Sequence, residues 1–406
     1  MQGDAITICL NMPELLVEGQ RQEGETLVVT VRYRCVSRPC PRCGRATSRV
    51  HQYHRQMKNH APLWGRPVLL EIRKRRFRCA GCRCVFMEPD EVCGWRRRST
   101  RAFRGALAEG CRTETVKAVA ARAQVSEALV RRSFGELAPT MLGGVTGTPS
   151  VLALDECYTG ARGGYLTVLY APEERQVVQL ALGRTQASAE ALLNQLPDGE
   201  RVEAVVMDMT EGYRQAVRTC CPRAAIVADK FHVLRHVLQA VERVCREVQA
   251  HAAKEDVPIL RRRSLFTASP TALTPAEREE RDRMLARYPP LGTAWEYAQD
   301  FRRIYGVGSR AEAAQALEAW WERVCAKGPR AFLGLGHLLS EWREELLNYL
   351  DHPVTNGFAE GKNNRIKVIM RSGYGYRNMT NLTQRILMTN HATAAAGQAH
   401  SPHFLT

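Results

Sequence analysis

Five short apolar runs between residues 151 and 230 constrain the fold more than any other feature of the chain. Each run has the length and the residue types of a buried strand: VLALDEC (151–157), YLTVLYA (165–171), VVQLALG (177–183), VEAVVMDM (202–209) and AAIVADK (224–230). The turn GARGG (160–164) favours a hairpin between the first two. Helical patterns at 188–196, with Ser188 as the expected N-cap, and at 212–220 separate the last three. The order of three strands, helix, strand, helix, strand predicts a mixed α/β domain.

Acidic residues end two of these strands. Asp155 lies at the end of the first run and Asp208 at the end of the fourth, while Glu360 lies in a polar segment that is typical of a helix start. A carboxylate at a buried strand end packs poorly, but its oxygens suit Mg²⁺ or Mn²⁺. Two such ions about 3.5–4 Å apart stabilise both oxygens of an in-line phosphoryl displacement. Asp229 also ends a strand, but a helix pattern follows at Phe231, so we interpret it as a helix cap or a residue behind the ligands, with metal contact as the less favoured alternative.

The segments that carry the acids resemble the ISL3-type family of bacterial insertion-sequence transposases. The most specific stretches are AVVMDMTEGYRQAV, PRAAIVADKFHVLRHV and NGFAEGKNNRIKVIMRSGYGYRN, which occur in the family's order. The resemblance implies an RNase H-like fold whose first and fourth strands are neighbours, so that Asp155 and Asp208 face each other across adjacent strand ends. It also implies that Asp155, Asp208 and Glu360 are the DDE triad that binds two metal ions.

Cysteines before the strand region indicate a zinc site. Cys40 and Cys43 form one knuckle, and Cys79, Cys82 and Cys84 lie in a second. A two-residue spacer allows two thiolates of one tight turn to reach a tetrahedral Zn²⁺ at about 2.3 Å. The gap between the knuckles is wide for a zinc ribbon, but the resemblance includes a zinc module with such a gap. Cys82 and Cys84 compete for the fourth position, and we prefer Cys82 for its spacing; reduced core cysteines and ligation by His51 or His54 are the alternatives.

Residues 113–137 predict a helix-turn-helix. Apolar residues repeat at helical spacing on either side of a break at 124–126, where Ser126 is a good N-cap. The second helix, 127–134, carries Arg131 and Arg132, which we expect to contact bases or phosphates in a major groove. An ordinary helical hairpin is the alternative. Upstream arginines are expected to bind phosphates: Arg96, Arg97 and Arg98.

Helical patterns fill residues 232–350, where we expect the tryptophans to lie in the core. The following helix joins Glu360 to side chains that we expect to bind DNA: Lys362, Asn363, Asn364, Lys367 and Arg371. Beyond it, Tyr374, Tyr376 and Arg377 suit either a strand contact or a structural turn. The predicted fold class is therefore multidomain α+β and α/β, with a zinc module (1–95), a helix-turn-helix and linker (96–149), an RNase H-like catalytic domain (150–252 and 351–406) and an all-helical insertion (253–350).

The charge distribution predicts a nucleic-acid partner. The formal net charge is +16, and residues 1–140 hold 26 Lys and Arg against 13 Asp and Glu, so most of the excess precedes the acids. No run of 18 or more apolar residues exists, and no signal peptide is recognisable at the start, so we expect no membrane partner and a cytoplasmic, nucleoid-associated protein.

These features together predict a DDE transposase that uses structural Zn²⁺ and two Mg²⁺ or Mn²⁺ ions. It cleaves double-stranded DNA at terminal inverted repeats and joins the freed strand to target DNA, and we expect a homodimer on DNA. A zinc-dependent DNA-binding regulator derived from a transposase is one alternative, which the presence of all three acids disfavours. A structure-selective nuclease of the same fold is the other, and it gives no reason for the extra DNA-binding modules.

Overall fold

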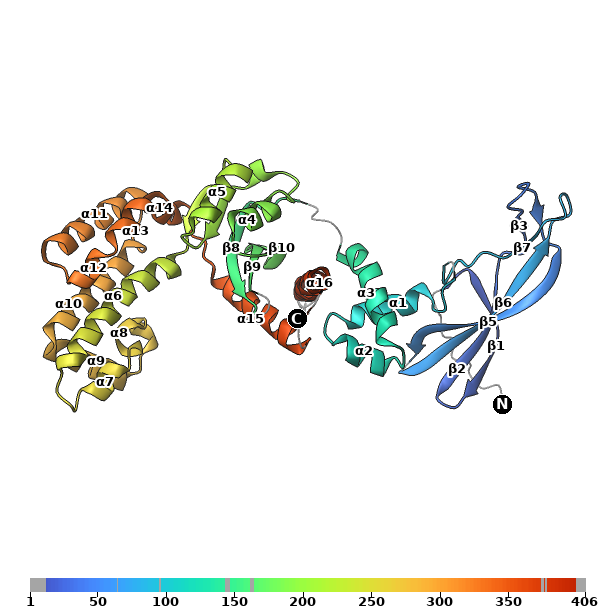
Figure 1. The fold of residues 1–406 in the computed structure, drawn as a ribbon, viewed down its shortest axis with the longest axis horizontal. Coiled ribbons are helices and arrows are strands. Elements are labelled where there is room, and N and C mark those ends of the chain that lie inside the picture. The colour runs from blue at the N-terminus through green and yellow to red at the C-terminus, as the bar shows by residue number, and fades with distance from the viewer. Residues whose placement is uncertain are drawn as a thin grey trace, which may run out of the picture. The chain divides into compact units, whose positions relative to one another are not determined.

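The computed structural model describes residues 12–63, 65–94, 96–142, 147–160, 164–373, 376 and 378–398 (Figure 1). Contacts within the chain divide it into two units. The first is Met1–Gly143 with Asn378–Thr389, and the second is Gly144–Arg377 with Asn390–Thr406. No described helix is long and apolar enough to cross a membrane.

A five-stranded sheet dominates the first unit. Its strands run in the order β1 (Leu15–Glu23), β2 (Thr26–Tyr33), β6 (Arg66–Arg78) and β5 (Val50–Leu63), and β7 (Val85–Met87) also pairs with β6. Alternating apolar side chains of β2 and β6, such as Val31 and Ile72, are buried in one core. A short hairpin of β3 (Arg38–Pro39) and β4 (Ala46–Thr47) holds the first cysteine knuckle.

Three helices complete the first unit: α1 (Arg101–Gly110), α2 (Val116–Arg122) and α3 (Glu127–Leu142). The Ser126 hydroxyl accepts a hydrogen bond from the Leu129 amide at 3.3 Å, so the expected cap at the break is present. The second helix of the pair continues past Phe134 to Leu142, because Ala138 extends its buried stripe. The first helix of the pair is shorter than the second, and α1 packs against α3 as a third member.

The C-terminal helix α16 (Met379–Gln398) contributes to the first unit. Met388 is buried in the cluster formed by α1, α2 and α3. The Arg112 side chain donates to the Met388 carbonyl at 3.3 Å, and Thr389 Oγ1 donates to the Arg112 carbonyl at 2.9 Å. This arrangement differs from the predicted division, which placed all of 351–406 with the catalytic domain, because Met388 of α16 packs with α1, α2 and α3.

The second unit contains a five-stranded sheet in the order β10 (Gln176–Leu182), β9 (Tyr165–Ala171), β8 (Val151–Tyr158), β11 (Ala204–Met207) and β12 (Ala225–Ala228). The first three strands are antiparallel, while β8, β11 and β12 are parallel. β8 and β11, the first and fourth strands of this unit in chain order, are therefore neighbours, as the family resemblance implied. Helices α4 (Gln186–Leu193) and α5 (Glu211–Cys220) and the short η1 (Gly199–Arg201) connect the later strands.

The cap of α4 was predicted incorrectly. Thr185, and not Ser188, occupies the N-cap, and its hydroxyl accepts a hydrogen bond from the Ser188 amide. Ser188 lies one turn inside the helix and donates to the Leu182 carbonyl at 2.7 Å. Both residues are good caps in isolation, and the end of β10 selects the earlier one.

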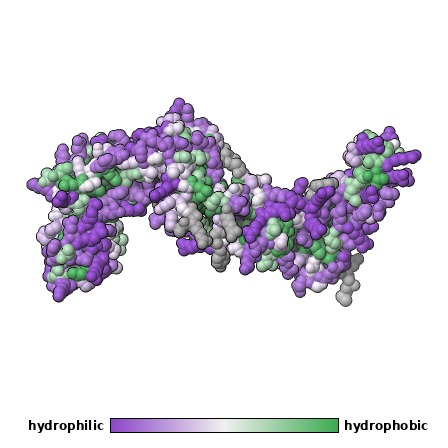
Figure 2. Space-filling model, in the orientation of Figure 1, coloured by the Kyte–Doolittle hydropathy of each residue, from purple (hydrophilic) through white to green (hydrophobic). Residues whose placement is uncertain are grey.

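Helices form the rest of the second unit. In Figure 1, α6 (Lys230–His251) extends from the sheet with the helices α7 to α14 gathered around it, whereas α15 lies against β8. Trp320 and Trp342 are buried in this helical core, as predicted. On the face drawn in Figure 2, hydrophilic residues cover most of the described surface and hydrophobic residues form only small patches. The remaining elements are α7 (Val257–Arg261), α8 (Ser264–Thr267), η2 (Pro270–Ala272), α9 (Pro275–Arg287), α10 (Pro289–Ile304), α11 (Arg310–Lys327), α12 (Arg330–Leu333), α13 (Gly336–Glu341), α14 (Arg343–Asp351) and α15 (Gly357–Ser372).

Candidate metal centres

Four cysteine sulfurs of the first unit lie within 4.8 Å of one another: those of Cys40, Cys43, Cys79 and Cys82. The Cys40 and Cys82 sulfurs are 3.5 Å apart, and those of Cys43 and Cys79 are 3.6 Å apart. Sulfurs held at about 2.3 Å from a tetrahedral Zn²⁺ lie about 3.8 Å from each other, so the cluster has the size of a zinc site. Cys82 is thus the fourth member, and Cys84, the alternative, lies outside the cluster.

The environment of the four thiols favours a bound cation. Amide hydrogen bonds from Cys82 and Gly81, opposed by burial, lower the pKa of the Cys79 thiol. An amide hydrogen bond from Cys84 lowers the pKa of Cys82, but burial and the neighbouring sulfurs raise it to about 11. A cation such as Zn²⁺ would offset the repulsion from neighbouring sulfurs that helps to raise the pKa of Cys82.

The second candidate centre lies at the ends of the parallel strands. Leu154 of β8 pairs with Met207 of β11, and Asp155 and Asp208 are the next residues of the two strands, where this pairing ends. Asp155 stays within β8, which continues to Tyr158 and is paired with β9. Burial, and next the charge of Asp208, raise the pKa of Asp155 to about 7. The two carboxylates thus repel each other in a partly buried position, as they would in a site that binds a cation.

A further acid and a histidine join Asp208. Asp208, Asp229 and His232 each offer one ligand atom within 4.8 Å of the others. His232 Nδ1 lies 2.7 Å from Asp208 Oδ1 and 2.9 Å from Asp229 Oδ2, but only the second contact has hydrogen-bond geometry. Asp208 Oδ1 is therefore buried without a hydrogen-bond partner among the described residues. Carboxylate oxygens such as those of Asp208 and Asp229 are the ligands that Mg²⁺ prefers in proteins.

Charge also couples the members of this group. Burial lowers the pKa of His232, but its contacts with Asp208 and Asp229 outweigh burial and raise the pKa to about 9. Asp229 occupies the N-cap position of α6, yet its carboxylate makes no cap bond; it accepts from His232 and, at 3.2 Å, from the Asn356 amide. Asp229 is only 1% exposed. Asp229 therefore belongs with Asp208 and His232, and we call these three residues the acidic group.

Asn363 of α15 holds Asp155. Its Nδ2 donates to Asp155 Oδ2 at 2.8 Å, and its Oδ1 accepts from the Tyr170 hydroxyl at 2.6 Å. Asn363 is 6% exposed and Tyr170 is fully buried. The sequence predicted that Asn363 contacts DNA. In the structure its side chain instead points inward and contacts β8.

Glu360 lies one turn before Asn363, in the first turn of α15. Its side chain is exposed and makes no hydrogen bond or ion pair with another described residue. It does not belong to the group of ligand atoms around Asp208. The helix that carries it is nevertheless fixed to the acidic strand, since Asn363 contacts Asp155.

The predicted DNA-binding residues differ in exposure. On α15, Asn364 and Arg371 are exposed, whereas Lys367 and Lys362 are half-buried. Burial, followed by repulsion from nearby arginines, lowers the pKa of Lys362, whose ammonium lies 5.1 Å from the Phe358 ring centre. Tyr374 and Arg377 lie outside the described residues.

In the first unit, two of the arginines that were predicted to bind DNA form ion pairs within the protein. Arg131 pairs with Glu127 on the same helix, and Arg97 pairs with Glu136 at 2.9 Å. Arg132, Arg98 and Arg96 are exposed.

Sequence reasoning missed two functional candidates, His232 and the positioning role of Asn363. The spacing of Asp229 and His232 in DKFH, with both residues at the start of a helix, is a signal for the first, since residues three apart share a helix face. No comparable signal exists for Asn363, because two asparagines stand together and only packing decides which points inward.

Two family models match the chain. Residues 152–386 match DDE_Tnp_ISL3, described as a transposase, and residues 37–82 match Zn_ribbon_ISL3, the zinc-finger of transposases IS204, IS1001, IS1096 and IS1165. A transposase for insertion sequence element IS1001 from Bordetella parapertussis is 28% identical over 376 residues, which cover 89% of this chain and 91% of that protein. A transposase for insertion sequence element IS1557 from Mycobacterium tuberculosis is 23% identical over 281 residues, which cover 62% of this chain and 63% of the relative.

Proposed function

This chain belongs to the ISL3 family of DDE transposases, and on that premise we propose that Asp155, Asp208 and Glu360 cut and join DNA strands with the help of Mg²⁺ or Mn²⁺. The observation that carries the proposal is the pair of acids where the β8–β11 pairing ends: the charge of Asp208 helps to raise the pKa of Asp155, and Asp208 Oδ1 is buried 2.7 Å from His232 Nδ1. The strand order around this pair supports an RNase H-like catalytic domain.

Each residue has a separate task in this proposal. Asp155 and Asp208 hold the metal at the strand ends, and Asn363 fixes the Asp155 carboxylate through its hydrogen bond. Glu360 is exposed and unpaired among the described residues, so its carboxylate is available to a metal and a DNA strand. Two bound divalent ions supply activation of the attacking oxygen and stabilisation of the leaving oxygen.

Asp229 and His232 have a supporting task. Their contacts with each other and with Asp208 hold the Asp208 carboxylate at the strand end, since the His232 ring lies between the two acids. Partners of metal ligands typically contribute 10- to 100-fold to metal affinity or activity. We therefore assign Asp229 to the site as a residue behind the ligands, which is one of the two interpretations that the sequence favoured.

DNA recognition falls to the first unit in this proposal. The zinc-ribbon module and the helices α1 to α3 carry most of the excess positive charge of the chain and no member of the acidic group. Exposed Arg132 and Arg98 suit contacts with the terminal inverted repeats, while α15 contacts the strand being cut. A homodimer on DNA would place one such unit on each end of the element.

The test is cleavage of a duplex that carries the terminal repeat found beside the gene. Asp155→Asn, Asp208→Asn and Glu360→Gln should each lower cleavage more than about 100-fold, because ligands contribute more than their partners. Asp229→Asn and His232→Ala should lower it about 10- to 100-fold.

The matched control is Glu200→Gln, which removes an exposed carboxylate of the same unit that makes only a 3.4 Å ion pair with Arg223. It should leave cleavage unchanged. Titration with Mn²⁺, followed by electron paramagnetic resonance, should show weaker binding for the Asp155 and Asp208 variants. Wild-type cleavage by any of the three triad variants would remove that residue from the site.

A further inference from the structure

An open groove lies beside the acidic group, where α6 leaves the sheet. Its volume is 860 Å³, and the first turns of α6 form one wall with Phe231, Leu234, Arg235 and Leu238. These residues follow the spacing of one helix face, so the wall is a continuous stripe. The groove therefore begins within three residues of Asp229 and His232, which hold Asp208.

Phe231 is the unusual member of this stripe. Its side chain is 52% exposed, although it lies between Asp229, which is buried, and His232, which is largely enclosed. Its ring lies beside the first residue of α15, since a methyl group placed on Gly357 would be 3.9 Å from it. Gly357 is three residues before Glu360, so the Phe231 ring of α6 lies next to the start of α15, the helix that carries Glu360.

Positive charge surrounds the ring. The groove is lined by Lys230, Arg235 and Arg302 against a single acid, Glu242. Arg235 makes no hydrogen bond or ion pair with another described residue, whereas Arg302 is engaged by backbone carbonyls of the helical core. Lys230 donates to the Tyr349 hydroxyl at 2.6 Å, and its ammonium is 5.5 Å from the Phe231 ring centre. An exposed ring flanked by available cations suits a base with its phosphate.

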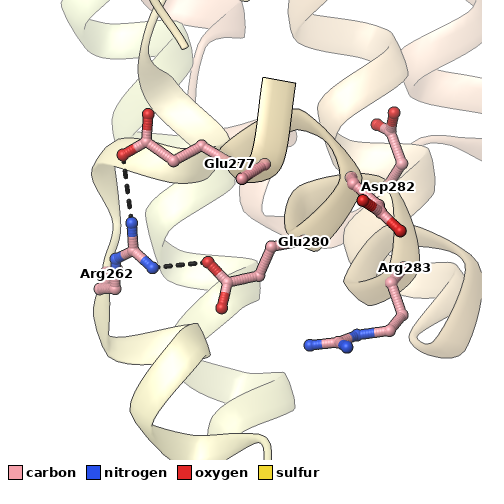
Figure 3. A pocket seen from close by; sticks show the side chains of 7 residues that line it. Arg262, Glu277, Glu280, Asp282 and Arg283 are labelled. Carbon is pink, nitrogen blue, oxygen red and sulfur yellow. Dashed lines mark hydrogen bonds and ion pairs between the residues drawn. The ribbon is translucent and has the colours of Figure 1, made fainter. Parts of the chain in front are cut away.

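A second groove, of 1060 Å³, lies on the helical segment and has the opposite character (Figure 3). Arg262 lies between Glu277 and Glu280 and is bound by both, at 3.2 and 2.5 Å. The lining has four acids against two arginines, so it repels a phosphate backbone. Of these two grooves, the one at Phe231 has the charge that fits DNA.

We propose that Phe231 stacks on one unpaired base next to the cleaved phosphodiester, while Arg235 and Lys230 contact the phosphate of that nucleotide. The proposal rests on the proposed function, because the base is positioned by a strand bound at the acidic group. Extrusion of the base from the duplex breaks one base pair and its stacking, and the contact with Phe231 replaces part of that stacking.

The experiment uses the full-length protein and the terminal-repeat duplex, with single abasic nucleotides placed in turn at the positions flanking the cleavage site. Phe231→Ala should cleave the intact duplex about 5- to 150-fold more slowly, the range expected for one base–aromatic stack. Phe231→Tyr should keep most of the activity, since it retains the ring. At one abasic position, wild type and Phe231→Ala should cleave equally, because the base that Phe231 contacts is gone.

Two controls separate stacking from other effects. Leu333→Ala removes another exposed apolar side chain of the same unit, 47% exposed, and should change nothing. 2-Aminopurine at the identified position should change its fluorescence when wild type binds without Mg²⁺, and Phe231→Ala should abolish that change.

The outcomes are distinguishable. Wild-type cleavage by Phe231→Ala on every duplex, or an equal loss on all of them with a lowered unfolding temperature, would overturn the stacking role. If the wild-type protein cut no duplex, the proposed function would fail. 2-Aminopurine placed in turn at each position of the terminal-repeat duplex would then decide whether Phe231 contacts a base.

Discussion

Replacing Asn363 by leucine tests whether this residue holds Asp155 or binds DNA. Leucine has a similar size but no polar atom, so Asp155 Oδ2 and the Tyr170 hydroxyl would each lose the partner that lies at 2.8 and 2.6 Å. A buried polar group left without a partner costs about 1–3 kcal/mol, and one that bonds a charged group lies at the upper end. The substitution should therefore destabilise the second unit by about 3–5 kcal/mol.

Calorimetry of the full-length protein measures this loss. At about 2–4 °C per kcal/mol for a unit of this size, the melting temperature of the second unit should fall by about 6–20 °C. Cleavage should fall as well, because Asp155 loses the donor that orients it. Binding of the terminal-repeat duplex should stay within about twofold of wild type, since most of the affinity comes from basic contacts elsewhere.

Asn364→Leu is the matched control, since Asn364 is the neighbouring asparagine and is exposed. It should leave the melting temperature nearly unchanged. Tyr170→Phe combined with Asn363→Leu should cost less than the sum of the two single changes, because both break the same hydrogen bond. If Asn363→Leu melted like wild type and weakened DNA binding instead, the interior placement of Asn363 would be refuted.

The remaining predictions concern the first unit. Cys82→Ser should release zinc, measured by elemental analysis of the purified protein, whereas Cys84→Ser should retain one equivalent because Cys84 lies outside the cluster. Arg132→Ala should reduce the discrimination between terminal-repeat and scrambled duplexes in a filter-binding assay, whereas Arg98→Ala should weaken both about equally; the opposite pattern would exchange their roles. Removal of residues 378–406 should lower the melting temperature of the helices α1 to α3, because Met388 leaves their core, and an unchanged transition would contradict that packing.

Local patterns sufficed for the strands and for the four cysteines that lie together. The apolar run before Asp155 and the run before Asp208 are each long enough to specify a buried strand, and the sheet pairs them through Leu154 and Met207. The preference for Cys82 over Cys84 followed from the two-residue spacer, which sets the reach of a tight turn.

Features set by packing between distant segments could not be read in this way. The inward turn of Asn363 depends on Tyr170, 193 residues earlier, and the choice of Thr185 over Ser188 as a cap depends on where β10 ends. Likewise, α16 has no local sign that its apolar side chains belong with α1 to α3. Glu360 was predicted as the third acid from the family motif alone, and cleavage by Glu360→Gln tests that role.

The contribution of α16 to the first unit affects how the chain matures during synthesis. A ribosome delivers the zinc module and α1 to α3 early, but Met388 and Thr389 emerge only after the whole acidic strand region has been made. Domains generally fold as their residues appear, so the nascent helices α1 to α3 wait with part of their apolar surface uncovered. Chains terminated early would therefore carry an incompletely packed group of helices, and we expect them to compete poorly with finished molecules for the ends of the element.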